Sequence, residues 1–244
     1  MNRVLEYLEQ KRQELEQLPF ILFVQDRSID PWQRLSFAPC LAPMTMGFAD
    51  LMVYGLRDVD SKDPDQQTLN AHTVVDDQHW RYLLQDLETL GMNAPMNFSG
   101  ALEQLWGKHC GQTRNLIYTT MALARGATPI IRLVTLEAIE VAADVGFSKF
   151  RQVGQEIAAK TGKKLIYFGQ SHQDVEDEHE AMGAKSIRGL ITAHTWTPEE
   201  EKVALRHVDQ VSACFTAMGA ELLAYLLKAR EAGPFWPLNP PKAG

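Results

Sequence analysis

Apolar residues recur at intervals of three and four along almost the whole of this chain, and no segment shows the alternating pattern of a strand. This spacing matches the period of an α-helix, about 3.6 residues per turn, so each segment has one apolar face to bury. We therefore predict an all-α fold, a bundle of about seven or eight helices. With 244 residues and 45% hydrophobic content, we expect one helical domain over 1–244, with its core in 10–230 and a proline-rich tail at 231–244.

Local signals predict where several helices begin and end. The first helix is expected over 2–17, and Asp30 followed by Pro31 is a typical helix start, with Asp as N-cap. A long helix is expected to follow the polar loop DVDSKDPDQQ and to end at Gly91. The later helices are expected at 129–143, ended by Gly146, at 148–160, at 164–182, and from the capping box Thr197-Pro-Glu-Glu200 to about 230.

Charge and cysteine content exclude several classes of partner. The net charge of −7 does not favour binding to nucleic acid or to an anionic membrane, because both repel a negative surface. The three cysteines are far apart and odd in number, which predicts neither a disulfide framework nor a thiolate zinc site. The first helix lacks the features of a leader peptide, and we expect no membrane span and a cytoplasmic location.

Two stretches of the chain, 72–79 and 172–179, carry the same pattern of histidine and acid. On a helix, positions i, i+4 and i+7 lie on one stripe, so each stretch is expected to present an imidazole, a carboxylate and a second imidazole on one face. These side chains are typical metal ligands, and the repeated pattern predicts a metal site. The six residues are His72, Asp76 and His79 in the early triplet, and His172, Glu176 and His179 in the late triplet.

The segment LVTLEAIEVAAD between the triplets offers two further carboxylates, Glu137 and Glu140, on an otherwise apolar face. An unpaired carboxylate is costly to bury, and a metal ion would offset that cost. Burial favours Glu137, which has Leu133 and Val134 as near neighbours, and both acids remain candidates. Four histidines and two or three carboxylates are too many ligands for one ion, so the sequence predicts two ions, with iron favoured and manganese or zinc as alternatives.

At these residues the chain resembles the heme-oxygenase-like di-metal oxidases, especially their CADD-like branch of death-domain-associating proteins. The late triplet matches a His-x-x-x-Asp/Glu-x-x-His motif of the family, and NAHTVVDDQHWRYLLQDLETLG is similar to the family's first ligand helix, with His79 as the matching histidine. The family has a Glu seven or three residues before this histidine, where this chain has His72 and Asp76. Its middle ligand is a Glu on an intervening helix, and Glu140 fits the spacing better.

The resemblance covers the expected core and implies a heme-oxygenase-like bundle that holds two iron ions. The implied activity is that of a non-heme di-iron oxidase or oxygenase, which uses O₂ and an external electron donor to oxidise a small organic substrate. Three alternatives stay open, namely a metal-independent enzyme of the thiaminase-like kind, a protein-interaction module on the same fold, and a heme-binding protein. The amphipathic first and last helices are candidate faces for a homodimer.

Overall fold

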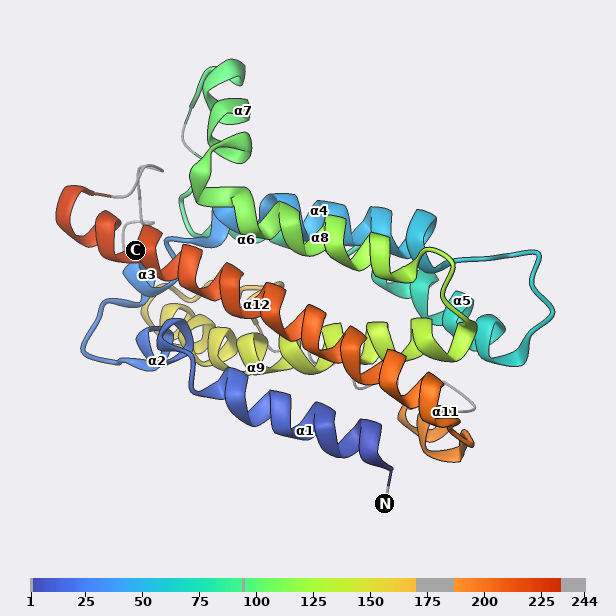
Figure 1. The fold of residues 1–244 in the computed structure, drawn as a ribbon. Helices are drawn as coiled ribbons and strands as arrows, with labels where there is room; N and C mark the ends of the chain where they lie inside the picture. The colour runs from blue at the N-terminus through green and yellow to red at the C-terminus, as the bar shows by residue number, and fades with distance from the viewer. Residues whose placement is uncertain (1, 94, 170–186, 234–244) are drawn as a thin grey trace.

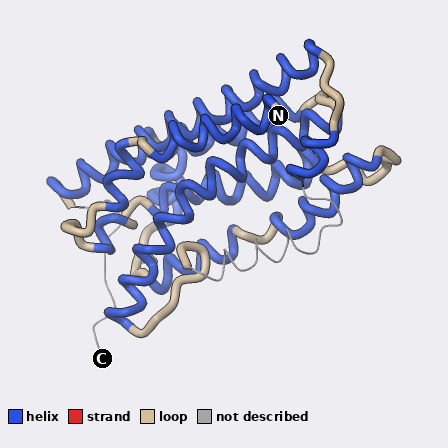
Figure 2. The backbone as a smooth tube through the Cα atoms, turned by 90° about the horizontal axis from the view of Figure 1, so that it is seen from below, coloured by secondary structure: helices blue, strands red, loops and turns tan. Residues whose placement is uncertain are grey.

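The computed structural model describes residues 2–93, 95–169 and 187–233, and within these ranges the chain forms helices and loops without a strand (Figure 2). The all-α fold expected from the apolar spacing is confirmed. These ranges contain more helical segments than the seven or eight expected, because prolines and turns divide several of them. The segments are α1 (Arg3–Glu16), α2 (Pro19–Gln25), α3 (Pro31–Arg34), η1 (Ala38–Leu41), α4 (Ala42–Asp50), η2 (Leu51–Leu56), α5 (Pro64–Asp76), α6 (Trp80–Thr89), α7 (Phe98–Trp106), η3 (Lys108–Cys110), α8 (Gly111–Ala124), α9 (Pro129–Thr161), α11 (Ile187–Ala193) and α12 (Pro198–Ala232).

Two long helices, α9 and α12, form the centre of the bundle (Figure 1). Helix α1 packs against both of them, while α8 contacts α12 and α9 and carries α4 and η2 on its other side. Helix α5 lies against α9 and η2, and the short α11 contacts α9, α1 and α5. One cluster of buried apolar side chains runs through these helices, and its members include all three cysteines, which are free thiols.

Three predicted helix starts are present. The side chain of Asn2 accepts hydrogen bonds at the start of α1, and the carboxylate of Asp30 accepts one from the backbone N–H of Trp32 at the start of α3. At the start of α12, Thr197 and Glu200 form both halves of the capping box. These ends were predictable because the cap and the backbone groups that it binds lie within a few residues of each other.

The long helix expected to reach Gly91 is instead two helices, and the early triplet is divided between them. Helix α5 ends at Asp76, residues 77–79 form a turn, and α6 begins at Trp80. The guanidinium of Arg57 donates to the carbonyl oxygen of Thr73 at 2.7 Å and to the carboxylate of Asp77 at 3.0 Å. A carbonyl oxygen at the end of α5 is therefore satisfied by a distant side chain, which stabilises the break.

The helix expected to end at Gly146 continues to Thr161, so 129–143 and 148–160 form the single helix α9. Gly146 has no positive φ and lies against the ring of Phe150, inside a face that remains buried through Val153. Helix α9 ends at Gly162, which has a φ of 71°. Gly162 ends α9 because its backbone lies in the left-handed region. At Gly146 the backbone stays helical because that face of the helix is buried.

The helix predicted to begin at Lys164 does not begin there. Residues 163–169 form a loop, and the carboxylate of Asp86 in α6 accepts hydrogen bonds from the backbone N–H groups of Ile166 at 2.7 Å and Phe168 at 2.9 Å. These contacts give the backbone amides a partner outside a helix. The rest of that predicted helix, 170–182, lies outside the described residues, and α11 was not predicted.

Two helical stretches, Pro31–Leu56 and Pro198–Glu231, are long and apolar enough to cross a membrane by length and composition. About half of each stretch is buried inside the fold, which is also true of core helices in soluble proteins. The cytoplasmic location therefore stays a prediction.

Candidate metal centre

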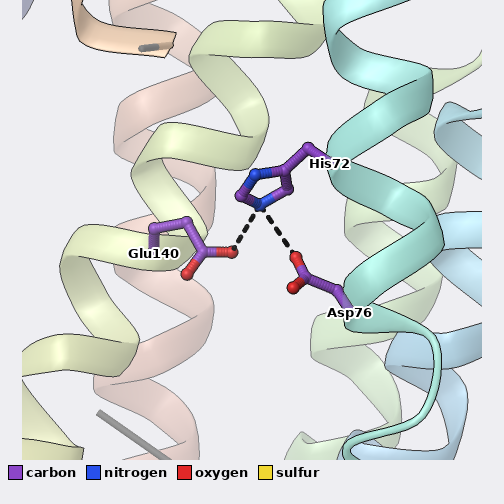
Figure 3. Close-up of side chains that lie close together, drawn as sticks. All are labelled: His72, Asp76 and Glu140. Carbon is purple, nitrogen blue, oxygen red and sulfur yellow. Dashed lines mark ion pairs between the residues drawn. The ribbon is translucent and has the colours of Figure 1, made fainter. Parts of the chain in front are cut away.

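Helices α5 and α9 bring three of the predicted ligands together. His72 and Asp76 lie one turn apart on α5, and Glu140 reaches them from α9 (Figure 3). The Nε2 atom of His72 lies 2.8 Å from Oδ2 of Asp76 and 3.8 Å from Oε1 of Glu140. One nitrogen and two carboxylate oxygens all lie within 4.8 Å of one another, a cluster that can hold a metal ion. We call these three residues the triad.

Polar contacts fix α5 against its neighbours and so set the position of the triad. Asp63 caps the start of α5, and Gln66, which is buried, donates to the carbonyl oxygen of Leu56 at 2.8 Å. The guanidinium of Arg132 on α9 donates to Oε1 of Gln66 at 3.0 Å. Helix α5 therefore cannot rotate or slide along α9 without breaking hydrogen bonds between partly buried groups.

The triad holds an excess of negative charge around one imidazole. Burial alone would lower the pKa of His72, but the nearby carboxylates of Asp76 and Glu140 outweigh it and raise that pKa to about 11. Burial, together with the negative charges of Asp76 and Glu137, raises the pKa of Glu140 above its usual range, although His72 opposes this shift. The site therefore favours a positive charge between its carboxylates, whether a proton or a metal ion supplies it.

Asp76 provides the sharpest test of whether a metal fits. Its side chain is 2% exposed, and within the described structure neither of its carboxylate oxygens accepts a hydrogen bond. The contact with His72 is short but does not have hydrogen-bond geometry, and Nε2 of His72 is also buried without a hydrogen bond. Buried polar atoms normally have partners, and a cation placed between these atoms would satisfy them together. The donor set therefore fits a metal ion.

Glu137, the other candidate acid, has a different partner. The Nε atom of Arg188 on α11 donates to Oε1 of Glu137 at 2.5 Å, and the Glu137 side chain is buried while that of Arg188 is half exposed. Sequence reasoning did not identify Arg188, because nothing in the local sequence connects it to an acid 51 positions earlier. The structure thus places Glu140 in the triad and Glu137 beside it.

His79, the third member of the early triplet, is not part of this cluster. It is the N-cap residue of α6, and its buried ring lies 5.9 Å from the ring of Tyr82, measured between centroids. The prediction that His72, Asp76 and His79 form one helical stripe was wrong, because α5 ends at Asp76 and the turn at residues 77–79 interrupts the helical repeat.

The late triplet, His172, Glu176 and His179, lies outside the described residues, so its place relative to the triad stays a prediction. Each of the other three histidines has a contact elsewhere in the fold. Nδ1 of His207 lies 2.9 Å from the hydroxyl of Thr135. The ring of His109 packs on Tyr225, and that of His194 packs on Trp196.

Comparison with known proteins adds no family. No protein-family model matches the chain, and no curated protein matches it in sequence. The metal centre is therefore inferred from the triad alone.

Proposed function

We propose that this protein is a non-heme metal-dependent oxidase or oxygenase with a heme-oxygenase-like helical bundle, in which the triad holds one of two metal ions. The observation that carries the proposal is the carboxylate of Asp76. It is buried, makes no hydrogen bond within the described structure, and lies beside an imidazole and a second carboxylate from another helix. A helical bundle that places such side chains on facing helices is how di-iron and di-manganese carboxylate sites are built.

The ligand types of the triad are compatible with three metals. Imidazole and carboxylate groups suit iron, manganese and zinc, and no cysteine belongs to the cluster. Two iron ions are the preferred occupant because iron, unlike zinc, can pass electrons to O₂. An external donor would supply those electrons, and a small organic molecule would be the substrate.

The protein's own residues supply ligand geometry and a largely buried environment. The side chain of Asp76 is 2% exposed, and those of His72 and Glu140 are 21% and 29% exposed. The low dielectric of this environment strengthens the attraction between the carboxylates and a cation. The hydrogen bonds of Gln66 with Leu56 in η2 and Arg132 in α9 hold the ligands in place before a metal binds.

A second ion needs further ligands near the triad. Glu137 and His79 are both buried, and Glu137 lies one turn from Glu140 on α9. Together with the late triplet, they are the candidates we propose for the second ion.

Metal titration of the purified protein tests the proposal. The metal-free protein is titrated anaerobically with Fe(II), Mn(II) and Zn(II), and bound metal is counted by mass spectrometry and calorimetry. We expect tight binding by the wild-type protein and a loss of affinity of at least about tenfold in Asp76→Asn. Optical spectroscopy of the iron-loaded protein after exposure to O₂ then tests for oxidation of the bound iron.

The adjacent residue provides a matched control. Asp77→Asn makes the same chemical change one position away, in a carboxylate that binds Arg57 instead of the triad, and should leave metal affinity unchanged. A folded wild-type protein that takes up no metal, or equal affinity in both variants, would contradict the proposal.

A further inference from the structure

Helix α7 has an apolar stripe that is not covered by the residues the structure describes. Phe98, Leu102 and Trp106 follow one another at intervals of four residues, so they lie on one face of the helix. Their exposed fractions are 79%, 43% and 65%, and no residue of α7 is buried. Figure 1 shows α7 standing away from the bundle, beyond the layer formed by α4 and α8. We call these three residues the α7 stripe.

Specific contacts hold α7 in this outward position. Asn97 caps its first turn, with Oδ1 accepting a hydrogen bond from the backbone N–H of Gly100 at 2.6 Å. At its other end, the guanidinium of Arg114 on α8 donates to the carbonyl oxygens of Leu105 and Trp106 and lies over the Trp106 ring, 5.5 Å from its centroid. The helix is thus fastened to α8 at its last turn, with the stripe left open to solvent.

A helix of this length needs a packing surface. Isolated helices shorter than about 12–15 residues are marginal in water, and α7 has nine residues with only Leu105 packed partly against the core. Two exposed aromatic rings on such a helix are unfavourable in a monomer, and clustered exposed apolar residues commonly mark an interaction site. The stripe is therefore typical of an interaction site.

The surface over α4, α8 and η2 of the same chain also exposes large apolar residues. Helices α4 and α8 and the segment η2 pack side by side, and each exposes one large apolar residue away from the core. Helix α7 rises from the start of α8, so it points away from this surface and cannot cover it within one molecule. We call this surface the α4–α8 face, and its exposed residues are Met46, Tyr54 and Tyr118.

We propose that a second copy of this chain covers the α7 stripe, in a two-fold dimer where α7 of each copy lies on the α4–α8 face of the other. A two-fold axis makes both contacts at once and leaves neither stripe open. An aromatic side chain buries roughly 150–250 Å². The interface would therefore bury on the order of 600 Å² per copy from four rings, those of Phe98, Trp106, Tyr54 and Tyr118. This area is close to the ~800 Å² per partner of a standard interface.

Charge favours a second copy over a lipid surface. Helices that lie on membranes are rich in Lys and Arg on their polar face, whereas α7 has neither and carries one acid, Glu103.

Sedimentation of the full chain tests this dimer, with Leu102→Glu as the disrupting variant and Leu227→Glu as its control. The two leucines have similar exposed fractions, 43% and 47%, but Leu227 lies on α12, away from the stripe. We expect the wild-type protein and Leu227→Glu to be dimers between about 1 and 100 µM, and Leu102→Glu to have a dissociation constant raised at least about tenfold. Tyr118→Asp, on the receiving face, should weaken the dimer in the same way.

Hydrogen exchange gives a second readout that does not depend on a variant. In the wild-type protein, amides of α7 should exchange more slowly as the concentration rises through the dimer transition. A wild-type protein that stays monomeric over this range would overturn the proposal, as would a dimer that Leu102→Glu and Tyr118→Asp leave intact. Flotation of a monomeric wild-type protein with neutral or anionic vesicles would assign the stripe to a membrane instead.

Discussion

Glu137 and Glu140 lie one turn apart on α9 yet face different partners. Arg188 binds the first, at 2.5 Å, whereas the second joins the triad through His72, at 3.8 Å. One acid is thus paired with a protein cation, whereas the other lies, among the described residues, beside the imidazole of His72 and the carboxylate of Asp76. This division makes the two glutamates a matched pair for testing the metal centre.

Glu140→Gln should weaken binding of the first metal ion at least about tenfold, because it removes an anionic ligand from the triad. Glu137→Gln should change the affinity for that ion by less than about threefold, since Arg188 already binds this carboxylate. Calorimetric titration with Mn(II) measures both. A larger loss in Glu137→Gln would show that the ion prefers the other carboxylate.

His207→Ala should leave metal binding unchanged but lower the free energy of unfolding by about 1–2 kcal/mol, because it removes a buried hydrogen bond to Thr135. Burial and, to a lesser degree, the charge of Arg206 lower the pKa of His207 below 6.5, so the folded protein favours the neutral ring. The difference in free energy of unfolding between the wild-type protein and the variant should therefore be largest above pH 6.5 and become smaller as the pH falls below 6.5. Urea denaturation at several pH values, with metal analysis of both proteins, provides the check.

Asp86→Asn should change how stability depends on pH. Burial raises the pKa of Asp86 from 3.8 to about 6, although backbone N–H groups of residues 166–168 partly oppose this shift. The Asp86 carboxyl group therefore stays protonated to higher pH in the folded state than in the unfolded state. Its ionisation lowers the free energy of unfolding as the pH rises from 4 to 6. Relative to Asp86→Asn, the wild-type free energy of unfolding should fall by about 2 kcal/mol between about pH 4 and pH 7. Parallel curves for the two proteins would refute this.

Gly154→Ala and Gly219→Ala should have opposite effects on stability, although both glycines lie inside long helices. A Cβ atom at Gly154 would come within 2.3 Å of the carbonyl oxygen of Phe168, so the variant should lose about 2 kcal/mol or more. At Gly219 the nearest atoms would be 3.6 Å away, and alanine should stabilise α12 by about 0.5–1 kcal/mol. Thermal unfolding of the two variants distinguishes these outcomes, and a stable Gly154→Ala protein would mean that the loop at Phe168 moves away.

The sequence by itself determined the helical class and several helix ends. Apolar spacing depends on the period of a helix, and caps such as Asp30 and Thr197 act on backbone groups within the same few residues, so both could be read locally. The sequence also identified all three members of the triad as ligand candidates, because imidazole and carboxylate groups at helical spacing are typical of metal sites. It could not decide which acid of α9 joins them.

Only the tertiary structure decided the remaining points, since each depends on a contact between residues far apart in the chain. Arg57 donates a hydrogen bond to a carbonyl oxygen near the end of α5 and so stabilises the break after Asp76. His79 therefore does not share a helix face with His72 and Asp76. Packing around Phe150 carries α9 through Gly146, and Arg188 takes Glu137 as its partner. A glycine inside a helix costs about 1 kcal/mol of helix stability relative to alanine. Burial of a long apolar helix face contributes several times that free energy.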